Sequence, residues 1–260
     1  MSEPCDIVVD RQGDGVVTIT LDRPRRKNAI TEEMWRSLTA ICHEIADRGD
    51  DRAVVITGAG GEFCSGADLS GESGGERHRL FKMQVVGDCC LAVANLPQPT
   101  IAKVSGVAVG AGMNLALACD LVVADSTARF SEIFSKRGLS VDFGGTWSLP
   151  RRIGLHRAKE LALLADIIGA AEAERIGLVN RVVDPSALDA FVADWAARLA
   201  AGPPIAMAQT KAMLNNSAGM SLAEALEAEG AAQALNFSTS DTAEAMKAFL
   251  DKREPRFEGR

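Results

Sequence analysis

Two glycine-rich stretches constrain this 260-residue chain more than any other feature of its sequence. The first covers residues 58–69 and the second covers residues 105–114, and each follows a short apolar run typical of a buried strand. Glycine lets the backbone adopt conformations that other residues avoid and approach a ligand closely. Two such turns could direct two backbone N–H groups at one oxygen atom, which would stabilise negative charge developing on a carbonyl.

The composition excludes several classes of protein. With 47% hydrophobic residues, the chain can bury a core large enough for one large domain, or for one domain with an appendage. A formal net charge of −7, 5% aromatic residues and no tyrosine argue against a nucleic-acid partner. No apolar run approaches the roughly 18 residues of a membrane span, so no membrane partner is predicted.

The cysteines and histidines favour a reduced protein without a metal site. The six cysteines are scattered and include no C-x-x-C pair, which indicates structural thiols and a cytoplasmic location. The three histidines are too few and too widely separated to form a metal cage. The start of the chain is short and acidic, so we expect no secretory or organellar leader there.

Strand-like and helix-like segments alternate along most of the chain. Such alternation predicts an α/β fold with right-handed crossovers. After about Ser186 the pattern is helical, and Gly202-Pro203-Pro204 separates a core of residues 1–201 from a helical region of residues 202–260. Residues 70–79 are polar and glycine-rich, which predicts a mobile loop. The expected strands are 16–21, 53–57, 100–104, 121–124 and 178–183, and the expected helices start after Thr31 or cover 80–96, 114–119 and 158–164.

A series of short motifs, in a fixed order, resembles the enoyl-CoA hydratase/isomerase (crotonase) superfamily over nearly the whole chain. Each motif is weak alone, and the specificity comes from their order. They are Arg23-Pro24 with Asn28-Ala29, Phe63-Cys64-Ser65-Gly66-Ala67-Asp68-Leu69, Gly110-Ala111-Gly112, Ala118-Cys119-Asp120, Gly144-Gly145-Thr146, Arg175-Ile176-Gly177-Leu178-Val179 and Phe249-Leu250-Asp251-Lys252-Arg253.

This resemblance implies a crotonase-like spiral of β-β-α turns and a C-terminal α-helical region used in trimer formation. It implies an acyl-CoA thioester substrate, no cofactor beyond the coenzyme A moiety, and a homotrimer or a dimer of trimers. The backbone N–H groups of Ala67 and Ala111 would hold the thioester oxygen. Phe249 and Lys252 match tail positions that meet the coenzyme A of a neighbouring subunit. The full set of implied substrate-binding residues is Lys27, Ser65, Gly66, Asp68, Leu69, Gly110, Asn114, Phe134, Phe249 and Lys252.

The catalytic acids separate the branches of this superfamily. Hydratases carry two glutamates, and the matching positions here hold Asn114 and Phe134. Asp142, just before the paired glycines, instead resembles the isomerase branch, including epoxyphenylacetyl-CoA and dienoyl-CoA isomerases. We therefore expect Asp142 to move a proton from one carbon to another through an enolate. Asp142 could alternatively be a helix cap or turn residue, and Glu132 could substitute for the second acid if it lay in a strand with Phe134.

Several functions remain open at this point. An acyl-CoA isomerase leads; a hydratase with substituted acids, a hydrolase or dehalogenase, and a non-catalytic acyl-CoA-binding protein are the alternatives. Residues 71–75 fit G-x-S-x-G but lack the preceding strand of a nucleophile elbow, and Leu115 breaks a dinucleotide fingerprint that starts at Gly110. We expect the acyl pocket to be formed by Met113, Phe134, Phe143, Trp147 and the segment 70–83.

Overall fold

Strand β3 (Ala53–Gly58) carries apolar side chains on both of its faces, which places it inside a covered sheet. In the computed structural model, which describes residues 6–70 and 78–260, Val54 and Ile56 point into one core and Val55 points into another. The six-stranded sheet has the order β1-β2-β3-β4-β6-β9, and only the β1–β2 pair is antiparallel. Its other strands are β1 (Ile7–Arg11), β2 (Val16–Leu21), β4 (Thr100–Val104), β6 (Leu121–Asp125) and β9 (Arg181–Val183).

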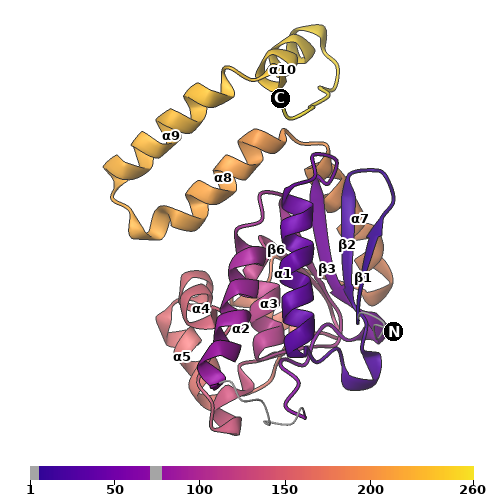
Figure 1. Ribbon diagram of the computed structural model, residues 1–260, viewed down its shortest axis with the longest axis vertical. Helices are drawn as coiled ribbons and strands as arrows, with labels where there is room; N and C mark the ends of the chain where they lie inside the picture. Colours follow the sequence, from indigo (N-terminus) through magenta and orange to yellow (C-terminus); the bar gives the residue numbers. More distant parts are fainter. Residues whose placement is uncertain (1–5, 71–77) are drawn as a thin grey trace.

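Helices cover both faces of this sheet (Figure 1). Helices α1 (Glu32–Ala46), α2 (Arg79–Ala94) and α3 (Ala111–Ala118) supply the larger core, and helix α7 (Leu188–Ala200) covers the opposite face. Thr31 caps α1 by accepting a hydrogen bond from the Met34 N–H at 3.2 Å. The sheet is therefore a fixed platform, and the two glycine-rich stretches leave it from β3 and β4.

A second, smaller sheet holds the residues that follow the second glycine-rich stretch. It has the order β5-β7-β8, with β5 parallel to β7 and β8 antiparallel to β7. Its strands are β5 (Val107–Val109), β7 (Arg129–Ser131) and β8 (Ile168–Gly169), and the helices beside it are α4 (Gly145–Ile153), α5 (Leu155–Leu164) and α6 (Ala170–Arg175).

The C-terminal helices form an arm that extends away from the rest of the chain (Figure 1). The arm consists of α8 (Pro204–Asn216), α9 (Leu222–Asn236) and α10 (Ser240–Asp251), and neither α8 nor α9 has a buried residue. An ion pair of 2.8 Å between Lys211 and the partly buried carboxylate of Asp120 connects α8 to the core. Helix α9 packs beside α8, yet all of its residues remain at least partly exposed.

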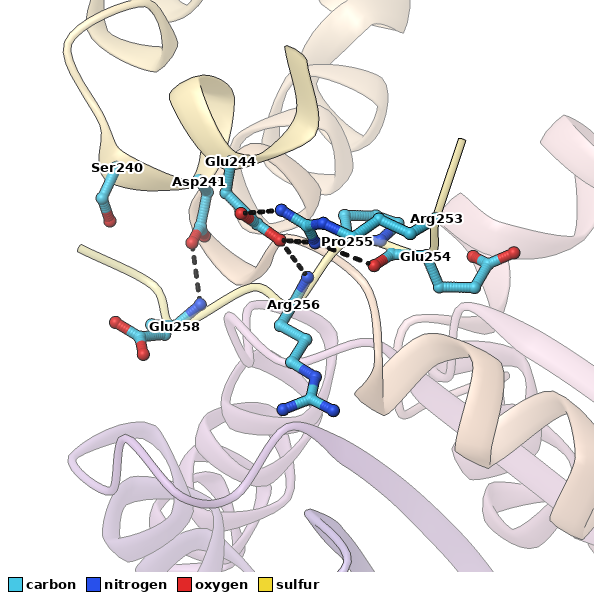
Figure 2. A pocket seen from close by; sticks show the side chains of 8 residues that line it. All are labelled: Ser240, Asp241, Glu244, Arg253, Glu254, Pro255, Arg256 and Glu258. Atoms are coloured by element: carbon cyan, nitrogen blue, oxygen red, sulfur yellow. Dashed lines mark hydrogen bonds and ion pairs between the residues drawn. The ribbon is translucent and has the colours of Figure 1, made fainter. Parts of the chain in front are cut away.

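The end of the chain folds back onto α10, as Figure 2 shows. Asp241 accepts hydrogen bonds from the backbone N–H groups of Glu258 and Gly259 at 2.7 Å and 3.0 Å. Glu244 pairs with the guanidinium of Arg253 at 2.6 Å. The two acids near the start of α10 thus fix the course of the last residues.

The expected elements agree with the structure where the apolar pattern is long. The strands at 16–21 and 100–104 and the helix after Thr31 are confirmed. The expected strand 178–183 was wrong in its first half, because only Arg181–Val183 pairs with β6. Sequence reasoning missed β1, the short strands of the second sheet, and α4, which starts at the paired glycines. The predicted mobile loop and the G-x-S-x-G match fall mainly on residues 71–77, which lie outside the described residues.

The family-like spiral and the α/β class are confirmed by this topology together with the comparisons reported below. The division at residue 201 stays a prediction, although α7 ends at Ala200 and α8 begins at Pro204. In the part of the chain that the structure describes, no helix has the length and apolar character needed to cross a bilayer.

Asn28 is a buried polar residue that holds the loop before the first glycine turn. Its Oδ1 accepts from the Arg23 N–H at 2.9 Å, and its Nδ2 donates to the carbonyls of Ala59 and Glu62 at 2.9 Å and 2.6 Å. Asn28→Ala would leave these main-chain groups unpaired, so we expect the free energy of unfolding to fall by about 2–4 kcal/mol. Urea unfolding measures this.

The control for that prediction is Asn216→Ala, since Asn216 is exposed and bonds only within its own helix. We expect its free energy of unfolding to change by less than about 0.5 kcal/mol. Equal losses in the two variants would contradict the role assigned to Asn28.

Candidate active site

The two glycine-rich stretches lie side by side because a pair of main-chain hydrogen bonds joins them. The Cys64 N–H donates to the carbonyl of Val107 at 2.8 Å, and the Val109 N–H donates to the carbonyl of Cys64 at 3.0 Å. Cys64 and Ala108 thus form an isolated parallel bridge between the two turns. This bridge places the first glycine-rich stretch, residues 58–69, beside the second, residues 105–114.

Gly66 and Gly110 then allow the two backbones to approach each other. Both have positive φ values, 98° and 56° respectively. A methyl group added to Gly66 would lie 2.9 Å from the Val109 carbonyl oxygen and 3.6 Å from the backbone nitrogen of Ala111. Only glycine fits this first position without moving the second turn.

Ala67 and Ala111, the expected oxyanion-hole residues, follow these glycines directly. Neither backbone N–H donates a hydrogen bond to an acceptor among residues 6–70 and 78–260. Ala111 is also the first residue of α3, so its N–H lies at the positive end of the helix dipole. The arrangement is suited to binding an oxygen that gains negative charge, and the assignment of the two N–H groups stays a prediction.

The side chain of Asn114 joins two acidic residues behind the second turn. Asn114, on α3, is 1% exposed, and its Nδ2 donates to the Asp142 carbonyl at 2.9 Å and to Glu132 Oε2 at 3.3 Å. Asn114 therefore links the segment after β7, which carries Glu132, to the segment before α4, which carries Asp142.

The surroundings of the two acids raise their pKa values. Burial raises the pKa of the Asp142 carboxyl from 3.8 to about 6. Burial also raises the pKa of the Glu132 carboxyl to about 8; the hydrogen bond from Asn114 opposes this increase and the charge of Asp142 adds to it. At neutral pH, Asp142 is mainly ionised and Glu132 is mainly neutral, so one group can accept a proton while its neighbour holds one.

Asp142 does not cap a helix with its side chain. The N-cap of α4 is Gly144, which makes no side-chain cap, and Asp142 takes part in the turn only through its main-chain oxygen, which accepts from Gly145. The Oδ1 atom of Asp142 is buried and has no hydrogen-bond partner in the described part of the chain. A buried carboxylate oxygen without a partner is suited to accept a proton from a bound molecule.

Phe143, next to Asp142, fixes the segment against α1. Its φ is +47°, an uncommon value for a large side chain, and its ring lies 4.9 Å from that of Trp35, measured between centroids. This contact holds Asp142 at the edge of the core rather than in solvent.

A cavity of about 1010 Å³ opens beside these residues, between α2, α3, α4 and α8. Asn114, Phe143 and Trp147 line it, so two of the expected pocket-wall residues are at its surface. Met113 and Phe134 are buried and do not line this cavity. Phe134 lies instead under the second turn, because a methyl group added to Gly110 would be 3.6 Å from its ring.

The residues expected to contact coenzyme A around the first turn are held by local bonds. Lys27 pairs with Glu62 at 2.9 Å, and the Ser65 hydroxyl donates to the Arg26 carbonyl at 3.2 Å. Leu69 is exposed at the edge of the turn. Their roles in binding stay predictions.

Asp68 has both carboxylate oxygens occupied. Ser70 donates to Oδ1 from its N–H and its hydroxyl, and Arg23 pairs with Oδ2 at 2.9 Å. The Ser70 hydrogen bonds, together with Arg23, lower the pKa of this carboxyl to about 2. A structural role in the turn accounts for all of these contacts, and binding through Asp68 stays a prediction.

The two tail residues lie far from this site within one chain. Phe249 is 82% exposed on α10, and Lys252 follows at the left-handed end of that helix with a φ of 54°. Their expected contact with coenzyme A would need a neighbouring subunit. Among the residues that the structure describes, no group of three His, Cys, Asp or Glu side chains is placed to hold a metal ion.

Glu132 was considered as a substitute acid on the condition that it lay in one strand with Phe134. That condition is not met, because β7 ends at Ser131 and Ile133–Arg137 form a 3₁₀ helix. The reason is that β5 ends at Val109, so β7 has no partner beyond Ser131. Glu132 is nevertheless fully buried beside Asn114. An acidic residue in an apolar segment was the available signal.

Comparison with known proteins assigns the architecture. The family model for enoyl-CoA hydratase/isomerase matches residues 11–260. The chain belongs to the enoyl-CoA hydratase/isomerase family. A relative from Rhodobacter capsulatus named "Probable enoyl-CoA hydratase" is 40% identical, and the match covers 95% of this chain and 96% of the relative. A 1,2-epoxyphenylacetyl-CoA isomerase from Escherichia coli is 36% identical over 98% of this chain and 99% of its own.

Solved structures agree with this assignment. An enoyl-CoA hydratase from Bacillus anthracis superposes with a TM-score of 0.94 at 34% identity, covering 98% of this chain and 100% of the other. Enzymes of the enoyl-CoA hydratase/isomerase family act on acyl-CoA thioesters, and this chain matches the family model over residues 11–260 and the solved fold over 98% of its length. Similar relatives are named as hydratases and as an isomerase, so the comparisons leave the reaction open.

The close approach of Gly66 to the second turn gives a direct test of the site. In Gly66→Ala, the new methyl group must displace the Val109 carbonyl, and we expect the adjoining Ala67 N–H to change direction as the turn shifts. Loss of one oxyanion-hole donor typically slows turnover by about 10²–10³-fold. We expect a loss of kcat of this order on the acyl-CoA substrate of the enzyme, measured by steady-state kinetics.

Gly61→Ala is the matched control, because Gly61 also has a positive φ, 76°, but an added methyl group meets nothing within 4 Å. We expect it to cost about 1–2 kcal/mol of stability and to leave kcat within about threefold of the wild-type value. Equal losses of kcat in both variants would mean that strain in the loop, rather than the approach of the two turns, controls the rate.

Proposed function

We propose that this protein is an acyl-CoA isomerase that moves a double bond, or carries out a related rearrangement, through a thioester enolate. The observation that carries the proposal is the half-buried Asp142 carboxylate, whose Oδ1 has no partner among the described residues. Asn114 and Phe134 occupy the positions at which hydratases resembling this chain have their two glutamates. Asp142 is thus the acid best suited to exchange protons with a substrate.

The reaction would begin with the thioester oxygen between the N–H groups of Ala67 and Ala111. Their hydrogen bonds, and the dipole of α3, stabilise the charge that this oxygen gains as an enolate forms. Each donor of this kind is worth about 3–4 kcal/mol of the barrier. Asp142 would take a proton beside the thioester carbonyl and return it at another carbon, so that the enzyme ends in its starting state.

The raised pKa of Asp142 suits this role. A carboxylate with a pKa of about 6 is ionised at neutral pH and is still a stronger base than an exposed aspartate. Such a base needs neither a metal nor a redox group for proton transfer, and we expect no cofactor beyond the coenzyme A moiety of the substrate. The cavity beside Asn114, Phe143 and Trp147 would receive the acyl group.

A hydratase is the second candidate, because Glu132 supplies another carboxyl group beside Asp142. The two acids are joined through Asn114, and two acids that hold one water molecule are what hydration requires. Several relatives are named as hydratases. A hydrolase would also use a carboxylate as base, but no observation favours it over the isomerase. A non-catalytic acyl-CoA-binding protein is less well supported, since the buried Asp142 oxygen without a partner would then have no use.

Asp142→Asn tests the isomerase proposal. With a β,γ-unsaturated acyl-CoA, the wild-type enzyme is expected to produce the conjugated thioester, and the variant to lose about 10²–10⁴-fold in kcat because it lacks the base. Absorbance of the conjugated thioester reports the rate. Undiminished turnover in Asp142→Asn would exclude Asp142 as the proton carrier.

Two controls complete this experiment. Asp189→Asn changes an exposed aspartate on α7 and should leave the rate unaltered. Crotonyl-CoA distinguishes the second candidate, because hydration removes the conjugated chromophore. Loss of that chromophore with no isomerisation would favour the hydratase, and binding of coenzyme A thioesters without either change would favour the non-catalytic alternative.

We also propose that the protein assembles as a homotrimer or a dimer of trimers in the cytoplasm. The support is the C-terminal arm, on which large apolar side chains are exposed: Leu222, Leu226, Leu235, Phe237, Phe249 and Leu250. A helix needs an apolar partner to be stable, and α9 buries none of its residues within the chain. In such an assembly, Phe249 and Lys252 would reach the coenzyme A of a neighbour.

Light scattering after size-exclusion chromatography should give three or six times the subunit mass of 27.5 kDa. Leu222→Glu with Leu226→Glu places two charges on one exposed face of α9 and is expected to shift the population to monomer. Ala228→Glu on the same helix is the control; it should shift the population to monomer less, since it removes no large apolar side chain. A monomeric wild-type protein at micromolar concentration would contradict the assembly.

A further inference from the structure

Glu132 has an environment that a carboxylate does not tolerate. Its side chain is fully buried, and its one hydrogen bond among the described residues is the 3.3 Å bond from Asn114 Nδ2 to Oε2. No ion pair links it to a cation in that part of the chain, and the nearest charge acting on it is the negative one of Asp142. A buried carboxyl group without a cation is more stable in its neutral form.

Two buried atoms without hydrogen-bond partners near Asn114 indicate that the Glu132 carboxyl group carries a proton. Asn114 Oδ1 and Glu132 Oε1 are both buried and both lack a hydrogen-bond partner among the described residues. An amide oxygen and an ionised carboxylate oxygen are both acceptors only, so neither can satisfy the other. A protonated Glu132 has an O–H to donate, and a neutral acid and a carboxamide can then exchange two hydrogen bonds.

The Asn114 carboxamide is in turn fixed against the start of α4. A methyl group added to Gly145 would lie 2.5 Å from Asn114 Nδ2 and 2.7 Å from its Oδ1. The same Nδ2 donates to the Asp142 carbonyl, which also accepts from the Gly145 N–H at 3.0 Å. The orientation of the amide therefore determines where the main chain of Asp142 lies.

We propose that Glu132 is a positioning residue of this site: as a neutral carboxylic acid it pairs with the Asn114 carboxamide, which holds the main chain of Asp142 and so directs its carboxylate. The inference rests on the proposed proton-transfer function of Asp142. It assigns Glu132 no contact with substrate, because its carboxyl group is covered by Asn114 and the surrounding core.

The pairing has an upper pH limit. The pKa of Glu132 is raised to about 8 by burial, so the O–H donor is present at neutral pH and is lost in mildly alkaline solution. Ionisation would also place a second negative charge beside Asp142 and the enolate. The groups that face Glu132 are Asn114 from α3 and Asp142 from the segment before α4, while Lys136 and Arg137 on the following 3₁₀ helix are exposed.

The test compares Glu132→Gln with Glu132→Leu. Glutamine keeps an acceptor for Asn114 Nδ2 and a donor for Asn114 Oδ1 but has no proton to lose; leucine removes the pair. The readout is deuterium incorporation at the α carbon of a β,γ-unsaturated acyl-CoA in D₂O, followed by NMR between about pH 5 and pH 9.5.

The wild-type exchange rate is expected to rise through about pH 6 as Asp142 ionises and to fall above about pH 8 as Glu132 ionises. Glu132→Gln should lack the fall above pH 8, and Glu132→Leu should lower the rate at every pH by about tenfold or more. The exposed Glu160 gives a matched control, and Glu160→Gln should keep the wild-type profile. An unchanged alkaline fall in Glu132→Gln would overturn the proposal.

Thermal unfolding provides a second measurement that does not depend on activity. Because the pKa of Glu132 is higher in the folded chain, its contribution to stability is complete below the unfolded value and is lost as pH rises toward 8. The Tm of Glu132→Gln relative to wild type should therefore increase steadily from pH 5 to pH 8. A constant difference overturns the inference, whereas absence of α-proton exchange in the wild type overturns only the proposed function.

Discussion

The parallel bridge between Cys64 and Ala108 is the contact on which the geometry of the site depends. It consists of two main-chain hydrogen bonds, and it aligns two turns that belong to different βα units of the fold. Because the bond donors and acceptors belong to the backbone, side-chain changes outside the glycines leave the alignment intact. The relative position of the two turns is therefore set independently of the acids that lie near them.

The acids of this chain form a connected group rather than two independent residues. Asn114 uses its side-chain amide to join Glu132 with the main chain of Asp142. A neutral amide at this position adds no negative charge beside the two acids.

Much of the fold could be predicted from the sequence, since long apolar patterns such as Val16–Leu21 and the helix after Thr31 depend on local spacing. The short strands β5 and β7 could not, because three residues carry too little pattern and their pairing depends on the bridge to Cys64. For the same reason, the sequence pointed to Asp142 but did not reveal that Glu132 contacts Asn114. That contact depends on β7 ending at Ser131, which only the three-dimensional pairing determines.

The left-handed backbone of Phe143 has a consequence for the preorganisation of the site. A large residue at a φ of +47° is held at a cost of about 1–2 kcal/mol, and the ring contact with Trp35 offsets part of it. The segment with Asp142 is therefore under tension and would relax if α1 shifted. Through Trp35, helix α1 holds the segment of Asp142 in a backbone conformation that is unfavourable for the isolated peptide. The carboxylate is therefore already in place before substrate binds, and little reorganisation is needed.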